Sequence, residues 1–151
     1  FLNYNRPTDL SEVVKLVHLK VLNLSSNSLL QLAHEITRLS NLRDFDVSSN
    51  QLASLQAEIA ALHALEELKA NDNSLTHLPP EIGSLQRLQL LSVAGNKLGN
   101  LPGELGRLTA LEKLLLNCNE LSTLIPEVGQ LRSLTELNLD ENPLVQLPPE
   151  I

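Results

Sequence analysis

One feature restricts what this chain can fold into more than any other: an asparagine recurs every 23 residues along it. The six members of this asparagine column are Asn27, Asn50, Asn73, Asn96, Asn119 and Asn142. Each lies in the pattern L-x-x-L-x-L/V-x-x-N-x-L-x-x-L-P-x-E-L/I-x-x-L, as residues 88–108 illustrate, and no insertion or deletion separates the six copies. A fixed period of this length predicts a solenoid, in which one structural unit stacks on the next.

The chain divides into a regular and a less regular part. The six regular copies occupy residues 19–151, and the last of them stops before the closing leucine that the others have. In residues 1–18, Leu2 and Asn5 reproduce part of the pattern, but Asn5 and Asn27 are 22 residues apart, one fewer than in the regular copies. We therefore expect residues 1–18 to be either a degenerate repeat or an N-terminal cap, which repeat arrays need to shield the open end of the core.

The two halves of each copy predict different structures. In the first half apolar and polar residues alternate, which is the periodicity of a strand, so Leu91 should point inward and its neighbours Leu90 and Ser92 outward. The second half, as in residues 78–85, should return the chain along the outer side through a short helical turn that begins with proline and then glutamate. The expected fold class is α/β: a curved parallel sheet on the concave face and short helical turns on the convex face.

Composition agrees with a repeat and argues against several functions. The chain is 42% hydrophobic, mostly leucine, with two Phe, one Tyr and no Trp or Met. A globular core would draw on larger aromatic side chains, whereas a solenoid restacks one medium-sized side chain. The net charge of −7 argues against nucleic acid as a partner, because phosphate binding requires clusters of Lys and Arg. No apolar run approaches the roughly 20 residues that cross a bilayer, so no membrane span is expected.

The single cysteine, Cys118, bears on the cellular compartment. It cannot form a disulfide within the chain, and the sequence shows neither paired-cysteine caps nor a recognisable signal peptide. These observations favour a reducing compartment, and we predict a cytoplasmic location.

The repeated pattern resembles the leucine-rich repeat, in the 23-residue form that carries LP-x-EI on its outer side. That form is similar to repeats in intracellular Ras-linked scaffold proteins and their plant relatives, in Scribble- and Erbin-type polarity scaffolds, and in some bacterial proteins. The resemblance implies a scaffold or adaptor role in signalling, with a small GTPase or its effector as partner by analogy. Similar repeats are also attached to kinases, phosphatases, GTPases, adenylate cyclases and deadenylases. A targeting domain of a larger multidomain signalling enzyme is therefore the alternative, and a structural subunit of a large assembly is a third interpretation.

The residues shared by all copies have structural explanations. Each asparagine amide carries donors and acceptors and can bond to its own loop and the next. The outer glutamates supply one carboxylate per copy at the start of a helical turn, whereas a hard cation needs six to eight oxygens around one point. The histidines fall in different columns, and no histidine lies in the columns beside Cys118. We therefore predict no catalytic residue, no metal site and no cofactor, and expect that the protein is not an enzyme.

Recognition is expected at the variable positions that face out of the concave sheet, because the scaffold does not require particular residues there. Seven of these positions are acidic and two are basic, and the acids flank a middle where Leu90, Ala94 and Leu115 are apolar. An apolar centre with a polar rim is typical of a protein interface. We predict a protein partner with a basic or mixed basic and apolar surface; the alternative is an acidic face that only aids solubility. The predicted partner-binding residues are Asp44, Asp46, Glu67, Lys69, Asp72, Leu90, Lys113, Leu115, Glu136, Asp140 and Glu141.

Overall fold

A computed structural model of the chain describes residues 12–149. The expectations for Leu2 and Asn5, and for residues 150 and 151 at the end of the last copy, lie outside the described residues.

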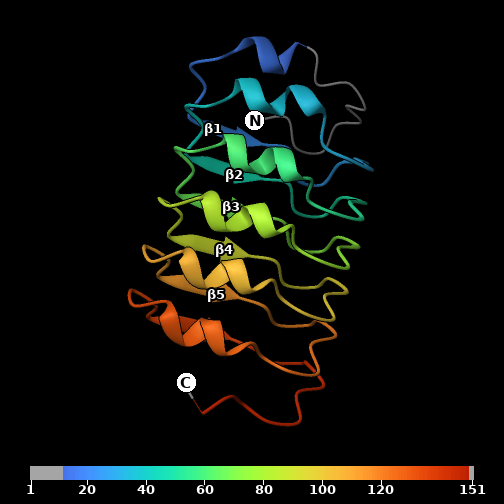
Figure 1. Cartoon of the computed structure of the whole chain (residues 1–151). Coiled ribbons are helices and arrows are strands. Elements are labelled where there is room, and N and C mark those ends of the chain that lie inside the picture. Colours follow the sequence, from blue (N-terminus) through green and yellow to red (C-terminus); the bar gives the residue numbers. More distant parts are fainter. Residues whose placement is uncertain (1–11, 150–151) are drawn as a thin grey trace.

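Six short strands and six 3-10 helical turns alternate along the described chain, and each copy forms one layer of a stack (Figure 1). The strands are β1 (Val21–Asn23), β2 (Asp44–Asp46), β3 (Glu67–Lys69), β4 (Leu90–Ser92), β5 (Lys113–Leu115) and β6 (Glu136–Asn138). The helical turns are η1 (Val13–Lys15), η2 (His34–Arg38), η3 (Ala57–Ala61), η4 (Pro80–Ser84), η5 (Gly103–Arg107) and η6 (Pro126–Gln130).

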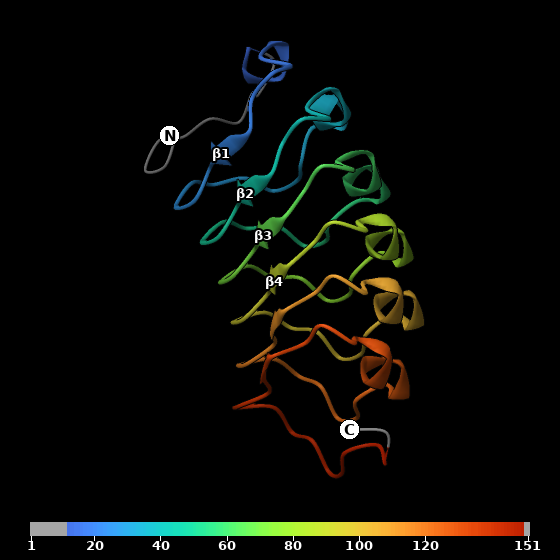
Figure 2. The same cartoon turned by 90° about the vertical axis from the view of Figure 1, so that its left-hand side faces the viewer.

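The strands form one parallel sheet in the order β1-β2-β3-β4-β5-β6. Its register repeats with the sequence period, so that Val21 pairs with Asp44 and Asp44 with Glu67. In the view of Figure 2 the strands lie along the inner side of the curved stack and the helical turns along the outer side. The predicted solenoid, with its parallel sheet on the concave face, is confirmed.

The core consists of stacked columns of leucine and other aliphatic residues. Leu91 and Val93 are fully buried, as are their equivalents in the neighbouring layers, such as Leu68 and Leu114. Burying each such side chain contributes about 1.5–3 kcal/mol. In the last described layer Leu137 is only partly buried, since no further layer of the described chain covers it.

The helical turns pack closely because two of them contain glycine at the point of contact. A Cβ atom on Gly83 would lie 2.5 Å from the carbonyl oxygen of Glu104, and one on Gly106 would lie 2.8 Å from that of Glu127. Both distances are shorter than a van der Waals contact allows, so the missing side chain lets adjacent turns approach.

The asparagine column links each layer to the one before it. The Nδ2 group of Asn96 donates to Val93 O in its own copy at 3.0 Å and to Ala70 O in the preceding copy at 2.9 Å. Its Oδ1 atom accepts from the backbone N–H of Leu75, also in the preceding copy, at 3.0 Å. The predicted bonding between loops is therefore confirmed, with one correction: the second loop is the preceding one, not the next. The same bonds recur at Asn50, Asn73, Asn119 and Asn142.

Candidate functional site

Each copy contributes four side chains to the concave face. Two of them are at the first and third positions of the strand. The residue directly after the strand points inward, and the two residues after it supply the other two. Parallel pairing in register places equivalent side chains in rows along the stack, at the spacing of about 4.7–4.9 Å between neighbouring strands. The first-position row is Val21, Asp44, Glu67, Leu90, Lys113 and Glu136, and the third-position row is Asn23, Asp46, Lys69, Ser92, Leu115 and Asn138. No two neighbouring residues in either row are identical, so this face varies where the core does not.

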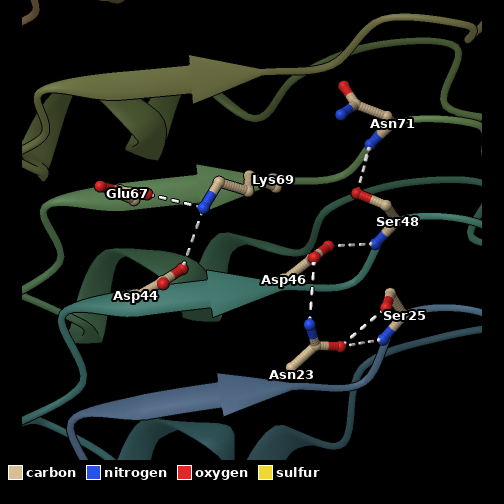
Figure 3. A network of polar contacts seen from close by, with 8 residues as sticks. All are labelled: Asn23, Ser25, Asp44, Asp46, Ser48, Glu67, Lys69 and Asn71. Atoms are coloured by element: carbon tan, nitrogen blue, oxygen red, sulfur yellow. Dashed lines mark hydrogen bonds and ion pairs between the residues drawn. The ribbon is translucent and has the colours of Figure 1, made fainter. Parts of the chain in front are cut away.

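The part of this face over β1, β2 and β3 is occupied by a network of polar contacts (Figure 3). Asp46 accepts hydrogen bonds from the Nδ2 group of Asn23 at 3.3 Å and from the backbone N–H of Ser48 at 2.9 Å. The Ser48 hydroxyl oxygen in turn accepts from the backbone N–H of Asn71 at 3.2 Å. An aspartate that bonds to the backbone two residues later forms an Asx-turn. Asp46 therefore helps to shape the loop after its strand, in addition to facing the open side.

Lys69 lies between two acids of the same face. Its Nζ atom is 2.6 Å from a Glu67 carboxylate oxygen and 3.5 Å from one of Asp44 (Figure 3). Partial burial lowers the pKa of Lys69, but the two carboxylates outweigh this effect, so that the pKa is raised above its ordinary value. The three residues together carry one net negative charge.

Over β4, β5 and β6 the face is more apolar. Leu90 pairs in register with Glu67 and Lys113, and Leu115 with Ser92 and Asn138. The two leucines thus occupy diagonal positions, and each is partly rather than fully exposed. Ala94, the third apolar residue of the predicted centre, is also half-buried.

Ser92 departs from the expectation that it points into solvent. It is only 4% exposed, and its hydroxyl donates to Oδ1 of Asn71 at 2.6 Å. A small side chain between Lys69 and Leu115 in its row is easily covered by longer neighbours.

The second basic residue of the face is also paired. The Nζ atom of Lys113 lies 2.9 Å from the carboxylate of Glu136, and this contact raises the pKa of Lys113. Farther along the last copy, Asp140 is exposed, and its backbone N–H donates to Oδ1 of Asn138 at 3.0 Å. Neither predicted basic residue therefore offers an unpaired positive charge to a partner.

The residue before each column asparagine has a left-handed backbone. This holds for Ser26, Ser49, Asp72, Gly95, Cys118 and Glu141, whose φ angles lie between 52° and 64°. The predicted site residues Asp72 and Glu141 belong to this column, and both side chains are exposed. Five of the six positions carry a residue with a Cβ atom, although such residues rarely adopt this conformation. The one glycine, Gly95, was the only signal of this geometry in the sequence.

A hollow of about 300 Å³ opens where strands β3, β4 and β5 begin. It is lined by Glu67, Gln89, Leu90, Glu112 and Lys113. Gln89 and Glu112 were not among the predicted binding residues, because they precede their strands and the strand pattern does not place them on the open face. A charged column at this position in the repeat, which also includes Arg43 and Glu66, could have suggested them. Arg43 and Glu66 form an ion pair at 3.1 Å.

Two further features of the described chain are relevant to function. Over residues 12–149, no three residues among His, Cys, Asp and Glu come together as a metal site would require. Over the same range, every helix is too short to span a lipid bilayer.

A family model and similar solved structures point to one family. The family model described as Leucine Rich Repeat matches residues 18–39 and 133–151. A leucine-rich repeat protein of Leptospira interrogans is 38% identical and superposes with a TM-score of 0.75, over 93% of this chain and 42% of that one.

Two plant structures are also similar. The ectodomain of the Arabidopsis thaliana membrane receptor kinase GASSHO1/SCHENGEN3, in complex with CASPARIAN STRIP INTEGRITY FACTOR 2, is 32% identical over 89% of this chain and 17% of that one, with a TM-score of 0.79. The Arabidopsis receptor kinase HAESA, in complex with the peptide hormone IDA and the co-receptor SERK1, is 29% identical over 87% of this chain and 23% of that one, with a TM-score of 0.77. The chain thus spans less than half the length of each of these three structures. No curated protein matches it by sequence.

Proposed function

We propose that this chain, which is a leucine-rich repeat protein, is a non-catalytic module that binds a protein partner on its concave face. Leucine-rich repeats are generally protein-interaction modules. Beyond this, we propose which face binds the partner, what chemistry the partner's surface has and what the cellular role is.

The observation that carries the proposal is the combination of partly exposed leucines and excess acid on one face. Leu90 and Leu115 are half-buried on the open side of the sheet, whereas the inward leucines of the same strands, Leu91 and Leu114, are fully buried. Around them, the two lysines of the face are paired with acids, which leaves five of the seven acidic charges in excess. A partner with basic residues beside an apolar group would complement this surface. The two similar plant receptor structures are complexes with a peptide hormone or a named factor, which supports a binding role for such a scaffold.

The proposed cellular role is that of a scaffold or adaptor in cytoplasmic signalling. The single cysteine supports the compartment, and the resemblance to Ras-linked scaffolds supports a small GTPase or its effector as partner.

A selection from a random peptide display library tests the proposed face. Peptides selected on the wild-type chain should be enriched in Lys and Arg next to apolar residues. The double variant Leu90→Arg plus Leu115→Arg should weaken their binding at least about tenfold, because it replaces both apolar side chains and reverses the local charge. A matched control is Ala57→Arg plus Ser84→Arg, at exposed positions of η3 and η4, which should keep the wild-type affinity. If the concave double variant is folded by circular dichroism and binds as well as the control, this face is not the binding surface.

A second candidate is a targeting domain of a larger signalling enzyme. Two of the similar structures belong to receptor kinases, and this chain covers only 17% and 23% of those chains. Any residues that flank this chain in the full-length protein would decide, since a catalytic domain would be recognisable there. The third interpretation, a structural subunit, predicts crosslinks to the convex turns rather than to the sheet.

A further inference from the structure

We propose that the hollow beside Leu90 is a subsite for one arginine side chain of the partner. This inference rests on the proposed function and adds where on the face the partner is anchored and by which chemical group.

The shape of the hollow suits a single long side chain. Leu90 pairs in register with Glu67 on one side and Lys113 on the other, so an apolar side chain lies between two charged ones. Gln89 and Glu112 line it from the positions where β4 and β5 begin. Its volume of about 300 Å³ is at the lower end of the range for small-molecule pockets, roughly 300–1,000 Å³. That space fits one amino-acid side chain better than a cofactor.

The charges around the hollow favour a cation. Glu67, Glu112 and Lys113 line the hollow. The ion pairs of this part of the face add the acids Asp44, Glu66 and Glu136 and the bases Arg43 and Lys69. Together these five acids and three bases carry a net charge of −2. All three bases are already engaged, at 3.1 Å, 2.6 Å and 2.9 Å from their acidic partners. Within the described residues the carboxylate of Glu112 has no ion pair, and it lies at the wall of the hollow.

Arginine matches this combination better than a compact cation does. Its methylene stem can pack on Leu90 while the guanidinium remains at the polar rim. The guanidinium is planar, weakly hydrated and carries five donors, so it can bond to Glu112 and Glu67 from one position. Since Glu67 already accepts from Lys69, the carboxylate of Glu112 should provide most of the recognition.

A methyl NMR titration tests the subsite directly. The probe is Nα-acetyl-arginine N-methylamide, with the citrulline analogue as its neutral counterpart of nearly equal shape. The arginine probe should shift the Leu90 methyl signals, with saturation in the millimolar range, and the citrulline probe should not. Glu112→Gln should raise the dissociation constant by about threefold to tenfold. The matched control is Glu120→Gln, at an exposed glutamate of the same copy, and it should change the dissociation constant less than twofold.

The subsite is refuted if the Leu90 signals do not move, if citrulline shifts them equally, or if Glu112→Gln has no more effect than Glu120→Gln. The display-selected peptides separate this failure from a failure of the proposed function. In one outcome, Leu90→Arg plus Leu115→Arg abolishes peptide binding, but binding is unaffected when the peptide arginines are replaced by citrulline and when Glu112 is replaced by glutamine. The concave face is then the binding surface, and the proposed arginine subsite is wrong. If the double leucine variant leaves peptide binding intact, the proposed function itself fails.

Discussion

Replacing Asn96 by leucine should test how the layers are held together. The amide makes four hydrogen bonds: its Nδ2 group donates to Ala70 O, Val93 O and Ala94 O, and its Oδ1 atom accepts from the backbone N–H of Leu75. Counting all four as lost would predict a very large destabilisation. The geometry of the column predicts a smaller one.

The three carbonyl groups keep another donor after the substitution. Val93 O still accepts from Asn119 at 3.0 Å, and Ala70 O from Asn73 at 3.3 Å. Ala94 O still accepts from a backbone N–H at 2.9 Å. The group left without its partner is the buried N–H of Leu75, and an unsatisfied buried donor costs about 1–3 kcal/mol. We therefore expect the free energy of unfolding to fall by about 1–3 kcal/mol.

Urea unfolding followed by circular dichroism measures this loss, and hydrogen exchange locates it. The midpoint should fall, and the Leu75 amide should exchange faster than in the wild-type chain. The control is Asn100→Leu, an exposed asparagine of the same copy, which should change stability by less than about 0.5 kcal/mol. A loss no larger than that of the control would refute the structural role of the amide. A loss well above about 3 kcal/mol would refute the sharing of carbonyls between neighbouring asparagines.

Three further predictions follow from the turns and loops. Gly83→Ala should lower the free energy of unfolding by about 1–3 kcal/mol, because the added Cβ would press on a carbonyl group of the next turn. Gly99→Ala is the control and should have no such effect, since nothing lies within 4 Å of its Cβ position. Equal effects of the two substitutions in urea unfolding would contradict this prediction. Cys118→Gly should raise the free energy of unfolding by about 0.5–1 kcal/mol, because glycine adopts the left-handed backbone of this position without strain. A decrease in thermal unfolding would show that the cysteine is unstrained. The hydrogen bond from His34 holds the pKa of Glu58 below its ordinary value. The contribution of this contact to stability is therefore present above the ordinary pKa and is lost as the pH falls through the lowered one. In His34→Ala a carbon-13 titration should show the pKa of Glu58 rising, and an unchanged value would be evidence against the pairing.

Repetition explains how much of the fold was predictable. Because Leu91 and Asn96 recur in every copy, their roles could be read from one period, and the strand, the turn and the interlayer amide followed. Side chains that differ between copies were harder to place. Whether Ser92 is covered, and whether Lys69 also reaches Asp44, depends on residues 21 and 25 positions away in adjacent layers, and the pattern of one copy does not contain them. The hollow was missed because Gln89 and Glu112 precede their strands, where the alternating pattern does not place side chains on the open face.

The asparagine bonds have a consequence for how such a surface can change over time. Each joins residues 21 or 26 positions apart, or lies within one copy, so the junctions from Asn50 to Asn142 are equivalent in these bonds. Excision or duplication of one complete unit therefore restores all of these bonds at the new junction, while loss of a fragment does not. Gene-level shuffling of whole units can lengthen, shorten or reorder the recognition surface at little thermodynamic cost, and the hollow beside Leu90 can be assembled or dismantled by exchanging a single unit.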